Sequence, residues 1–297
     1  MVQGGAVPAL FVFGDSQTDV GNNNNNLVTP FRANFPHNDV DYPPGNLATG
    51  RFSNGYNLAD FMGTKGLAIT FGEQIERDYL SVYKRLVQKL GKAQATTHLA
   101  SSIFAAGIGG NDIATRVLSD PTTTTTDQLL LISDQQFINL LSKSLKRKLQ
   151  RLYELGMRKL FLVGTGPLGC YPLLRQRSLV AMECDAEANA LSRQYNAAAV
   201  AILRDMSTRH PGLAVLLLGP IRGGFAEAKA ACCGVGESAA LLICMPANTL
   251  CANRTSHVFW DGGHLTEVTA EKLTGIAFNG SAPLVSPVNL KQLSAAP

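Results

Sequence analysis

The sequence Val-Pro-Ala-Leu-Phe-Val-Phe-Gly-Asp-Ser, at residues 7–16, combines a short apolar run with an abrupt glycine stop. Such a run is typical of a buried strand that opens into a loop at its carboxyl end. The pattern recurs at residues 101–108, 159–164 and 213–219. Four short apolar strands, each stopped by glycine, predict a mostly parallel sheet that is buried on both faces.

Amphipathic helical patterns lie between these strands. They cover residues 73–90, residues 134–155 and residues from about 183 to 209. Gly91 can stop the first helix, Asp134 can cap the second, and Pro211 with Gly212 ends the third. The alternation of strands with helices predicts an α/β fold with right-handed crossovers between parallel strands.

The loops after the first two strands carry polar side chains. Ser16 follows the first strand, and Asn111 stands in Gly-Gly-Asn-Asp, residues 109–112, after the second. In parallel α/β sheets, ligands bind beyond the carboxyl ends of the strands. We therefore expect Ser16 and Asn111 to converge on one crevice.

Size and composition fit one domain over residues 1–297. The chain is 45% hydrophobic, which suffices for one substantial core, and nothing in it is typical of a linker. Its net charge is +4, and its basic residues are scattered apart from a cluster at residues 143–151 that helical spacing explains as a solvated face. No apolar run approaches the roughly 20 residues needed to cross a bilayer. We expect neither a nucleic-acid partner nor a transmembrane segment.

The signals for the cellular compartment disagree. Residues 1–6 are small and polar and lead directly into the first strand, so we expect no signal peptide in this chain. Asn253 and Asn279 each begin an Asn-x-Ser/Thr sequon, which weakly favours the secretory pathway. These residues alone leave the compartment open.

All cysteines lie in the C-terminal half of the chain, at Cys170, Cys184, Cys232, Cys233, Cys244 and Cys251. The sequence alone cannot choose their pairing. Their clustering in short stretches favours local disulfides, because no Cys-x-x-Cys pair or nearby His pair supplies the spacing of zinc ligands. We expect disulfides, no metal and no cofactor.

Ser16, Asp261 and His264 are residues that could carry chemistry. A serine hydroxyl becomes a strong nucleophile when a base removes its proton, and the base needs a third group that fixes its tautomer. In Asp-Gly-Gly-His, residues 261–264, a tight turn lets the carboxylate reach one ring nitrogen while the other faces the nucleophile. Taken singly, Gly-Asp-Ser, Asp-x-x-His and Gly-Gly-Asn-Asp are each more often ordinary turns or loops. Spacing alone therefore leaves the function open.

Six blocks occur in a fixed order along the chain. They are Ala-Leu-Phe-Val-Phe-Gly-Asp-Ser with Asp-Val-Gly-Asn-Asn (9–16, 19–23), Thr-Gly-Arg-Phe-Ser-Asn-Gly with Asn-Leu-Ala-Asp-Phe (49–55, 57–61), Gly-Gly-Asn-Asp (109–112), Gly-Pro-Leu-Gly-Cys (166–170), Cys-Cys-Gly (232–234) and Phe-Trp-Asp-Gly-Gly-His (259–264). With these blocks, nearly the whole chain resembles the plant GDSL esterases/lipases of the SGNH hydrolase superfamily. Six ordered motifs are hard to explain by chance.

The resemblance implies a serine carboxylic-ester hydrolase with a flavodoxin-like, three-layer α/β/α sandwich. It implies that Ser16 is the nucleophile, that His264 is the general base and then acid, and that Asp261 orients His264. The Ser16 backbone N–H and the Asn111 side-chain amide would stabilise the oxyanion, each contributing roughly 3 kcal/mol in the transition state. The substrate would be a lipid, a polyester or an acetylated cell-wall ester, and family members are typically secreted.

The chain departs from the family pattern between Phe61 and Glu73. The family has a third oxyanion donor there, a glycine N–H in a Gly-rich block that follows a strand. Here the connecting segment, residues 62–72, is short, and a strand of the sheet could be lost with the block. Gly66 or Gly72 could substitute, although neither has the expected setting.

Two smaller departures touch no reacting atom. Gln17 stands where the family usually has Leu, and Leu265 stands where Pro commonly follows the histidine.

The shortened segment also keeps two alternatives open. One is a family member that binds an ester or glycan without hydrolysing it, and the other is a shortened product that does not fold stably. The sequence gives no indication of the oligomeric state.

Overall fold

The fold is built around a sheet of short strands. The structure is a computed structural model that describes residues 7–21, 24, 32–43, 47–62, 70–119, 131–178, 183–218, 227–235 and 243–296. Its main sheet has five strands in the order β1-β2-β3-β4-β9, and the first four are parallel to their neighbours while β9 is antiparallel. The strands are β1 (Leu10–Phe13), β2 (Ile103–Gly107), β3 (Lys159–Val163), β4 (Ala214–Leu218) and β9 (Val285–Pro287). The predicted, mostly parallel sheet is thus confirmed.

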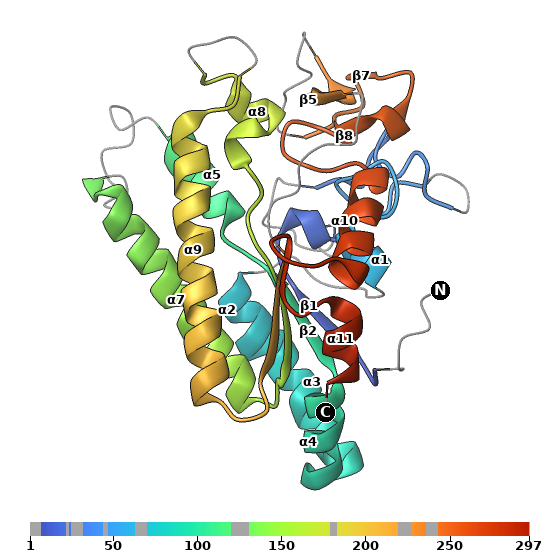
Figure 1. Ribbon diagram of the computed structural model, residues 1–297. Helices are drawn as coiled ribbons and strands as arrows, with labels where there is room; N and C mark the ends of the chain where they lie inside the picture. The colour runs from blue at the N-terminus through green and yellow to red at the C-terminus, as the bar shows by residue number, and fades with distance from the viewer. Residues whose placement is uncertain are drawn as a thin grey trace.

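Helices cover both faces of this sheet (Figure 1). One face carries α2 (Phe71–Glu73), η3 (Gln74–Tyr79), α3 (Leu80–Leu90), α5 (Gly110–Leu118), α7 (Asp134–Glu154) and α9 (Ala186–Arg209). The other carries α10 (Glu267–Asn279) and α11 (Leu290–Ala295), and α1 (Leu58–Met62) packs against α10. None of the helices in the described part of the chain is both long and apolar enough to cross a bilayer.

Alternating side chains of β2 show why the sheet needs two helical layers. Phe104 and Ala106 belong to the core beneath α7 and α9, whereas Ile103 and Ala105 belong to the core beneath α10 and α11. Successive residues of a strand point to opposite faces, so a strand that is apolar throughout must be covered on both. The expected three-layer α/β/α architecture is therefore confirmed.

Side-chain caps set the helix boundaries and correct one prediction. Ser133, rather than Asp134, caps α7. Its hydroxyl accepts a hydrogen bond from the Gln136 N–H, and its own N–H donates to the Gln136 side-chain oxygen. Asp185 caps α9, because its side chain accepts a hydrogen bond from the Ala188 N–H at 2.8 Å. Gly91, with a φ of +77°, ends α3 as predicted, and α4 (Lys92–Ser101) follows at once.

The strand that carries Ser16 lies at one edge of the sheet. Among the described residues, no strand pairs with the outer side of β1. The buried side chain of Gln74 bonds there instead, because its Oε1 accepts from the Gly14 N–H at 3.1 Å and its Nε2 donates to the Gly14 carbonyl at 2.8 Å. One side-chain amide thus supplies the donor and the acceptor that a neighbouring strand would offer.

The short segment that replaces the Gly-rich block is only partly described. Residues 63–69, including Gly66, lie outside the described residues. Gly72 lies in α2 rather than after a strand, and a Cβ on it would be 3.8 Å from Lys148 Cε of α7. Gly72 therefore does not stand in the setting of the family's glycine donor.

Smaller elements frame the carboxyl edge of the sheet. They are η1 (Ser16–Thr18), η4 (Leu168–Cys170), α8 (Pro172–Arg175), β5 (Glu227–Ala231), β6 (Cys233–Gly234), β7 (Thr249–Leu250), η5 (Arg254–Ser256) and β8 (His257–Phe259). Strand β5 pairs with β8, and β6 pairs with β7. Together they support the turn that carries His264.

Candidate active site

Ser16 begins a single turn of 3-10 helix, η1, directly beyond β1. Asp15 caps this turn, because its Oδ1 accepts a hydrogen bond from the Gln17 N–H at 3.0 Å. Gly14, on the other side, is held by the Gln74 side chain. The peptide on either side of Ser16 is thus fixed, which keeps the serine hydroxyl at the carboxyl end of the sheet.

Asp261 organises the turn that follows β8. Its Oδ1 accepts hydrogen bonds from the Gly263 N–H at 2.9 Å, the His264 N–H at 2.9 Å and the His264 Nδ1 at 2.7 Å. Its Oδ2 accepts from the Cys244 N–H at 3.2 Å. The carboxylate has no solvent exposure, so these donors replace the water that it loses on folding.

The two turns meet at the imidazole of His264. Its Nε2 lies 2.8 Å from Ser16 Oγ, although the two residues are 248 positions apart in the chain. Because Asp261 is an acceptor, it favours the tautomer with the proton on Nδ1, and Nε2 is then left to accept the serine proton. The structure therefore brings together all three residues of the predicted Ser-His-Asp set.

The surroundings of His264 are largely closed to water. The His264 side chain is buried, and the ring of Phe52 stacks on it with centroids 4.7 Å apart and planes 27° apart. Asp15 is close enough to interact electrostatically with His264, and burial raises the pKa of the Asp15 carboxyl despite the Gln17 N–H and the His264 charge, which lower it. A dry environment of this kind strengthens each hydrogen bond in the relay.

Asn111 lies in the first turn of α5, beyond the carboxyl end of β2. Strand β2 neighbours β1, and Ala106 pairs with Phe13, so Asn111 and Ser16 leave the same edge of the sheet. Within the described residues no hydrogen bond joins Asn111 to Ser16 or His264, and the Asn111 side chain is exposed. Its amide is therefore free of these two residues and accessible from solvent.

Tight packing fixes the entry into α5. Gly109 has a φ of +106°, and a Cβ on it would lie 2.6 Å from the ring of Tyr195. The Tyr195 hydroxyl donates to the Ile108 carbonyl at 2.9 Å. Only glycine fits both the backbone conformation and the contact, so Gly109 is a structural requirement for placing Asn111.

Two of the three disulfides, Cys232–Cys251 and Cys233–Cys244, lie against the turn of His264. The pairs are Cys170–Cys184, Cys232–Cys251 and Cys233–Cys244, each local in sequence as predicted. The Cys232 and Cys233 N–H groups donate to the carbonyls of Phe259 and Trp260. Cys244, cross-linked to Cys233, delivers its own N–H to Asp261. The disulfide segment therefore supports the carboxylate directly.

Sequence reasoning missed several residues that support the site. Phe52 lies in the Thr-Gly-Arg-Phe-Ser-Asn-Gly block, which could have drawn attention to it. Gln17 touches no reacting atom, as expected, but its Nε2 donates to the Gly263 carbonyl at 2.6 Å, a contact that the sequence does not indicate. No sequence motif indicates the roles of Gln74 and the Cys244 N–H. Gln74 bonds the backbone of Gly14, and Cys244 uses its backbone N–H, which any residue could supply.

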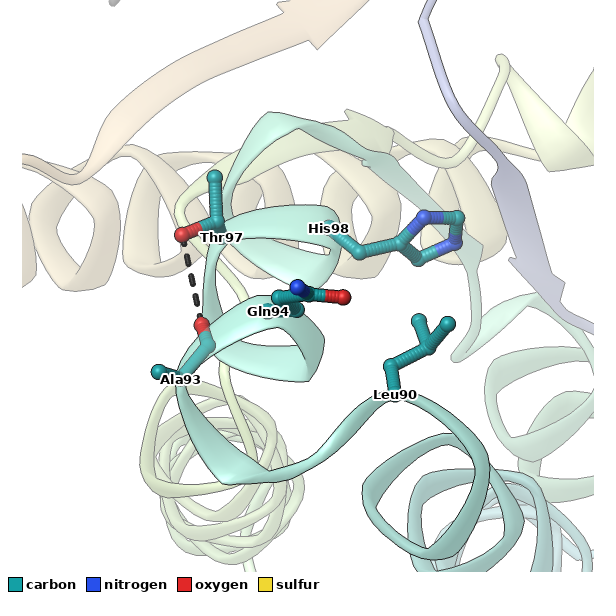
Figure 2. Close-up of a pocket in the computed structure, with 5 residues that line it drawn as sticks. All are labelled: Leu90, Ala93, Gln94, Thr97 and His98. Carbon is teal, nitrogen blue, oxygen red and sulfur yellow. Dashed lines mark hydrogen bonds between the residues drawn. The ribbon is translucent and has the colours of Figure 1, made fainter.

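A separate hollow lies away from this site. It is an open depression of about 450 Å³ at the junction of α3 and α4, and Leu90, Gln94 and His98 point toward it (Figure 2). Helix α4 leads into the amino end of β2, so the hollow lies at the edge of the sheet opposite Ser16. It is not part of the site formed by Ser16 and His264.

Comparison with known proteins agrees with the order of the motifs. The family described as GDSL-like Lipase/Acylhydrolase matches residues 10–274. Three relatives from Arabidopsis thaliana, each named GDSL esterase/lipase, are 31%, 31% and 30% identical to this chain. Their alignments cover 97%, 99% and 98% of this chain, and 90%, 92% and 89% of the respective relatives.

The first alignment extends over 354 residues, more than the 297 of this chain, so it contains gaps opposite segments that this chain lacks. The match nevertheless spans most of the chain and includes the turns of Ser16 and His264. The chain therefore belongs to the GDSL-like lipase/acylhydrolase family of hydrolases that act on ester bonds.

Proposed function

We propose that the protein is a serine carboxylic-ester hydrolase that works through an acyl-serine intermediate. The observation that carries the proposal is the continuous relay from Asp261 to His264 at 2.7 Å and from His264 to Ser16 at 2.8 Å. Distances of this size are within reach of general-base catalysis. Each residue keeps the role that the family resemblance implies.

In the proposed reaction, Ser16 Oγ attacks the ester carbonyl while its proton passes to His264 Nε2. The bond between the acyl carbon and the alcohol oxygen then breaks, and the alcohol leaves with the proton from His264. Water repeats the sequence on the acyl-serine, which releases the carboxylic acid and restores Ser16. Asp261 stabilises the imidazolium in both halves.

The oxyanion would be stabilised by the Ser16 backbone N–H and the Asn111 side-chain amide. The family's third donor has no counterpart among the described residues, and losing one donor typically costs roughly 10²-fold to 10³-fold in turnover. We therefore expect turnover of p-nitrophenyl acetate to fall below that of a relative with the complete block by about that factor. Equal turnover of the two proteins would contradict this expectation.

The substrate class follows from the family resemblance. We propose a small or polymeric ester, such as a lipid, a polyester or an acetylated cell-wall polysaccharide, acted on by one domain over residues 1–297. We also propose that the protein works outside the cytosol. Three disulfides support that location, because such bonds persist in oxidising compartments.

Active-site labelling tests the nucleophile, the base and the crevice together. A fluorescent fluorophosphonate should react with the folded protein at one site, and Ser16→Ala should abolish the reaction. Mass spectrometry of the labelled peptide should place the adduct on Ser16. Absence of labelling in protein that unfolds cooperatively would overturn the proposed function.

A second candidate is a family member that binds esters or glycans without hydrolysing them. The shortened segment between Phe61 and Glu73 favours it, because a donor to the oxyanion is missing from the sequence. The intact relay of Ser16, His264 and Asp261 favours the enzyme. Binding of a family ester with no detectable hydrolysis and no labelling would decide for this second candidate.

A further inference from the structure

A second hydrogen bond joins the turn of Ser16 to the turn of His264. Gln17 Nε2 donates to the carbonyl oxygen of Gly263 at 2.6 Å, across 246 positions of the chain. We infer that Gln17 is a positioning residue that sets the separation between Ser16 Oγ and His264 Nε2. The inference rests on the proposed function, since it concerns how that serine is activated.

The acceptor of this bond belongs to the peptide group that carries His264. The Gly263 carbonyl and the His264 N–H are the two polar ends of one planar peptide. Asp261 Oδ1 accepts from the N–H end at 2.9 Å, and Gln17 donates to the carbonyl end at 2.6 Å. With both ends held, the peptide cannot rotate about its flanking bonds, and the Cα of His264 is fixed.

The donor is itself tied to the nucleophile. Gln17 is the residue after Ser16, both lie in η1, and the Gln17 N–H is held by Asp15 Oδ1. A movement of the serine turn therefore carries the Gln17 amide with it. Because that amide holds the Gly263 carbonyl, the turn of His264 must follow, and the distance between base and nucleophile is preserved.

Leucine, which the family usually has at this position, cannot make this bond because its side chain has no donor. The distance between a general base and its proton controls proton transfer, and a misplacement of about 1 Å can cost roughly 100-fold in rate. Removal of the Gln17 amide should thus slow the chemical step. It should leave ester binding unchanged, because the amide points at the protein backbone.

The test compares three substitutions at Gln17 with one matched control. Gln17→Leu restores the usual family residue, Gln17→Met keeps the length without a donor, and Gln17→Glu keeps the shape but opposes a carboxylate to the Gly263 carbonyl. The control is Gln135→Leu, because the Gln135 side chain is exposed on α7 and bonds only locally to Asn139. Each protein is assayed with a fluorophosphonate over a range of probe concentrations and with p-nitrophenyl butyrate.

Each rate is divided by the amount of serine that the probe labels at completion. Unfolded protein, which the probe does not label, is thereby left out of the comparison. We expect the Gln17 variants to lose about 10-fold to 100-fold in the maximal labelling rate and in kcat. The half-saturating probe concentration and KM should stay within about twofold of the unaltered protein, and the control should match it. A role limited to folding would lower Tm and leave these rates per labelled site unchanged.

The outcomes separate this inference from the proposed function. Wild-type rates in Gln17→Met and Gln17→Leu, or losses confined to KM, would overturn the positioning role and leave the hydrolase proposal intact. No labelling of the unaltered protein would overturn the hydrolase proposal itself. A loss in kcat shared by all three Gln17 variants and absent from the control would establish the role.

Discussion

Asp261 is buried and accepts hydrogen bonds on both oxygens, so replacement by asparagine has no favourable orientation. One orientation opposes the asparagine NH₂ to the Cys244 N–H, and the other opposes it to His264 Nδ1 and favours the wrong tautomer. The charge that stabilises the imidazolium is lost in both. We expect Asp261→Asn to lower kcat for p-nitrophenyl butyrate by roughly 10³-fold to 10⁴-fold.

Asp134→Asn is the control for that substitution, because the Asp134 side chain is 48% exposed and pairs with Arg116 instead of a residue of the site. The control should keep full turnover. Turnover of Asp261→Asn within tenfold of the unaltered protein would show that the carboxylate does not orient the base.

Single residues of the site were predictable where they sit in ordered motifs. Ser16, Asp261 and His264 were named from the sequence, and the structure brings them within hydrogen-bonding distance. Gln17 and Gln74 were not assigned a contact, because each bonds a backbone group far away in the chain. A hydrogen bond to a distant backbone group produces no motif or periodic spacing in the sequence.

At the scale of elements, the helical segment from α2 to α3 makes hydrogen bonds to the edge strand β1 that a neighbouring strand would otherwise make. Gln74, on η3, bonds both the N–H and the carbonyl of Gly14 at the edge of β1 that no strand of the described residues pairs with. Gln74→Met fills a similar volume and leaves both backbone groups without these partners. Since each buried unsatisfied group costs about 1–3 kcal/mol, we expect the free energy of unfolding to fall by about 2–4 kcal/mol.

Urea denaturation at neutral pH measures this loss, with Gln135→Met on α7 as the control. Gly14 lies two residues before Ser16, so the maximal labelling rate of Gln74→Met should fall as well. An unchanged urea midpoint would mean that water satisfies the edge of β1 as well as Gln74 does.

The elements that sequence predicted best were those with a strong apolar run. All four predicted strands form, each shorter than its run, and the three predicted helical segments form, two of them with shifted starts. Helix α4 was missed because its apolar residues keep no clear face, and its end takes up Ser101, predicted as strand. Strand β9 was missed because three residues, Val285–Pro287, are too few for a periodic pattern.

Over the whole molecule, Asp41 and Arg254 join segments 213 positions apart in a two-pronged ion pair. Hydrogen bonds from Arg254, with a further one from Asn54, lower the pKa of Asp41 below its usual 3.8 despite partial burial. A carboxyl whose pKa is lower in the folded state stabilises the protein above the unfolded value. That contribution is lost as the pH falls through the lowered pKa.

We therefore expect Asp41→Asn to reduce the free energy of unfolding by about 1 kcal/mol at pH 7, the size typical of a partly exposed pair. The difference from the unaltered protein should shrink as the pH falls below about 3.8. Urea denaturation at pH 7 and at pH 3 measures it. A difference that stays constant between these pH values would assign the effect to packing instead of charge.

Because Ser16 and His264 are 248 positions apart, a ribosome completes Ser16, the proposed nucleophile, long before it reaches His264, the proposed base. The growing polypeptide carries an unactivated hydroxyl for most of its synthesis. The proposed hydrolysis can begin only when residues 261–264 have emerged and folded back against Ser16. A translation product that stops before residue 261 would be inert toward esters, whatever shape it takes.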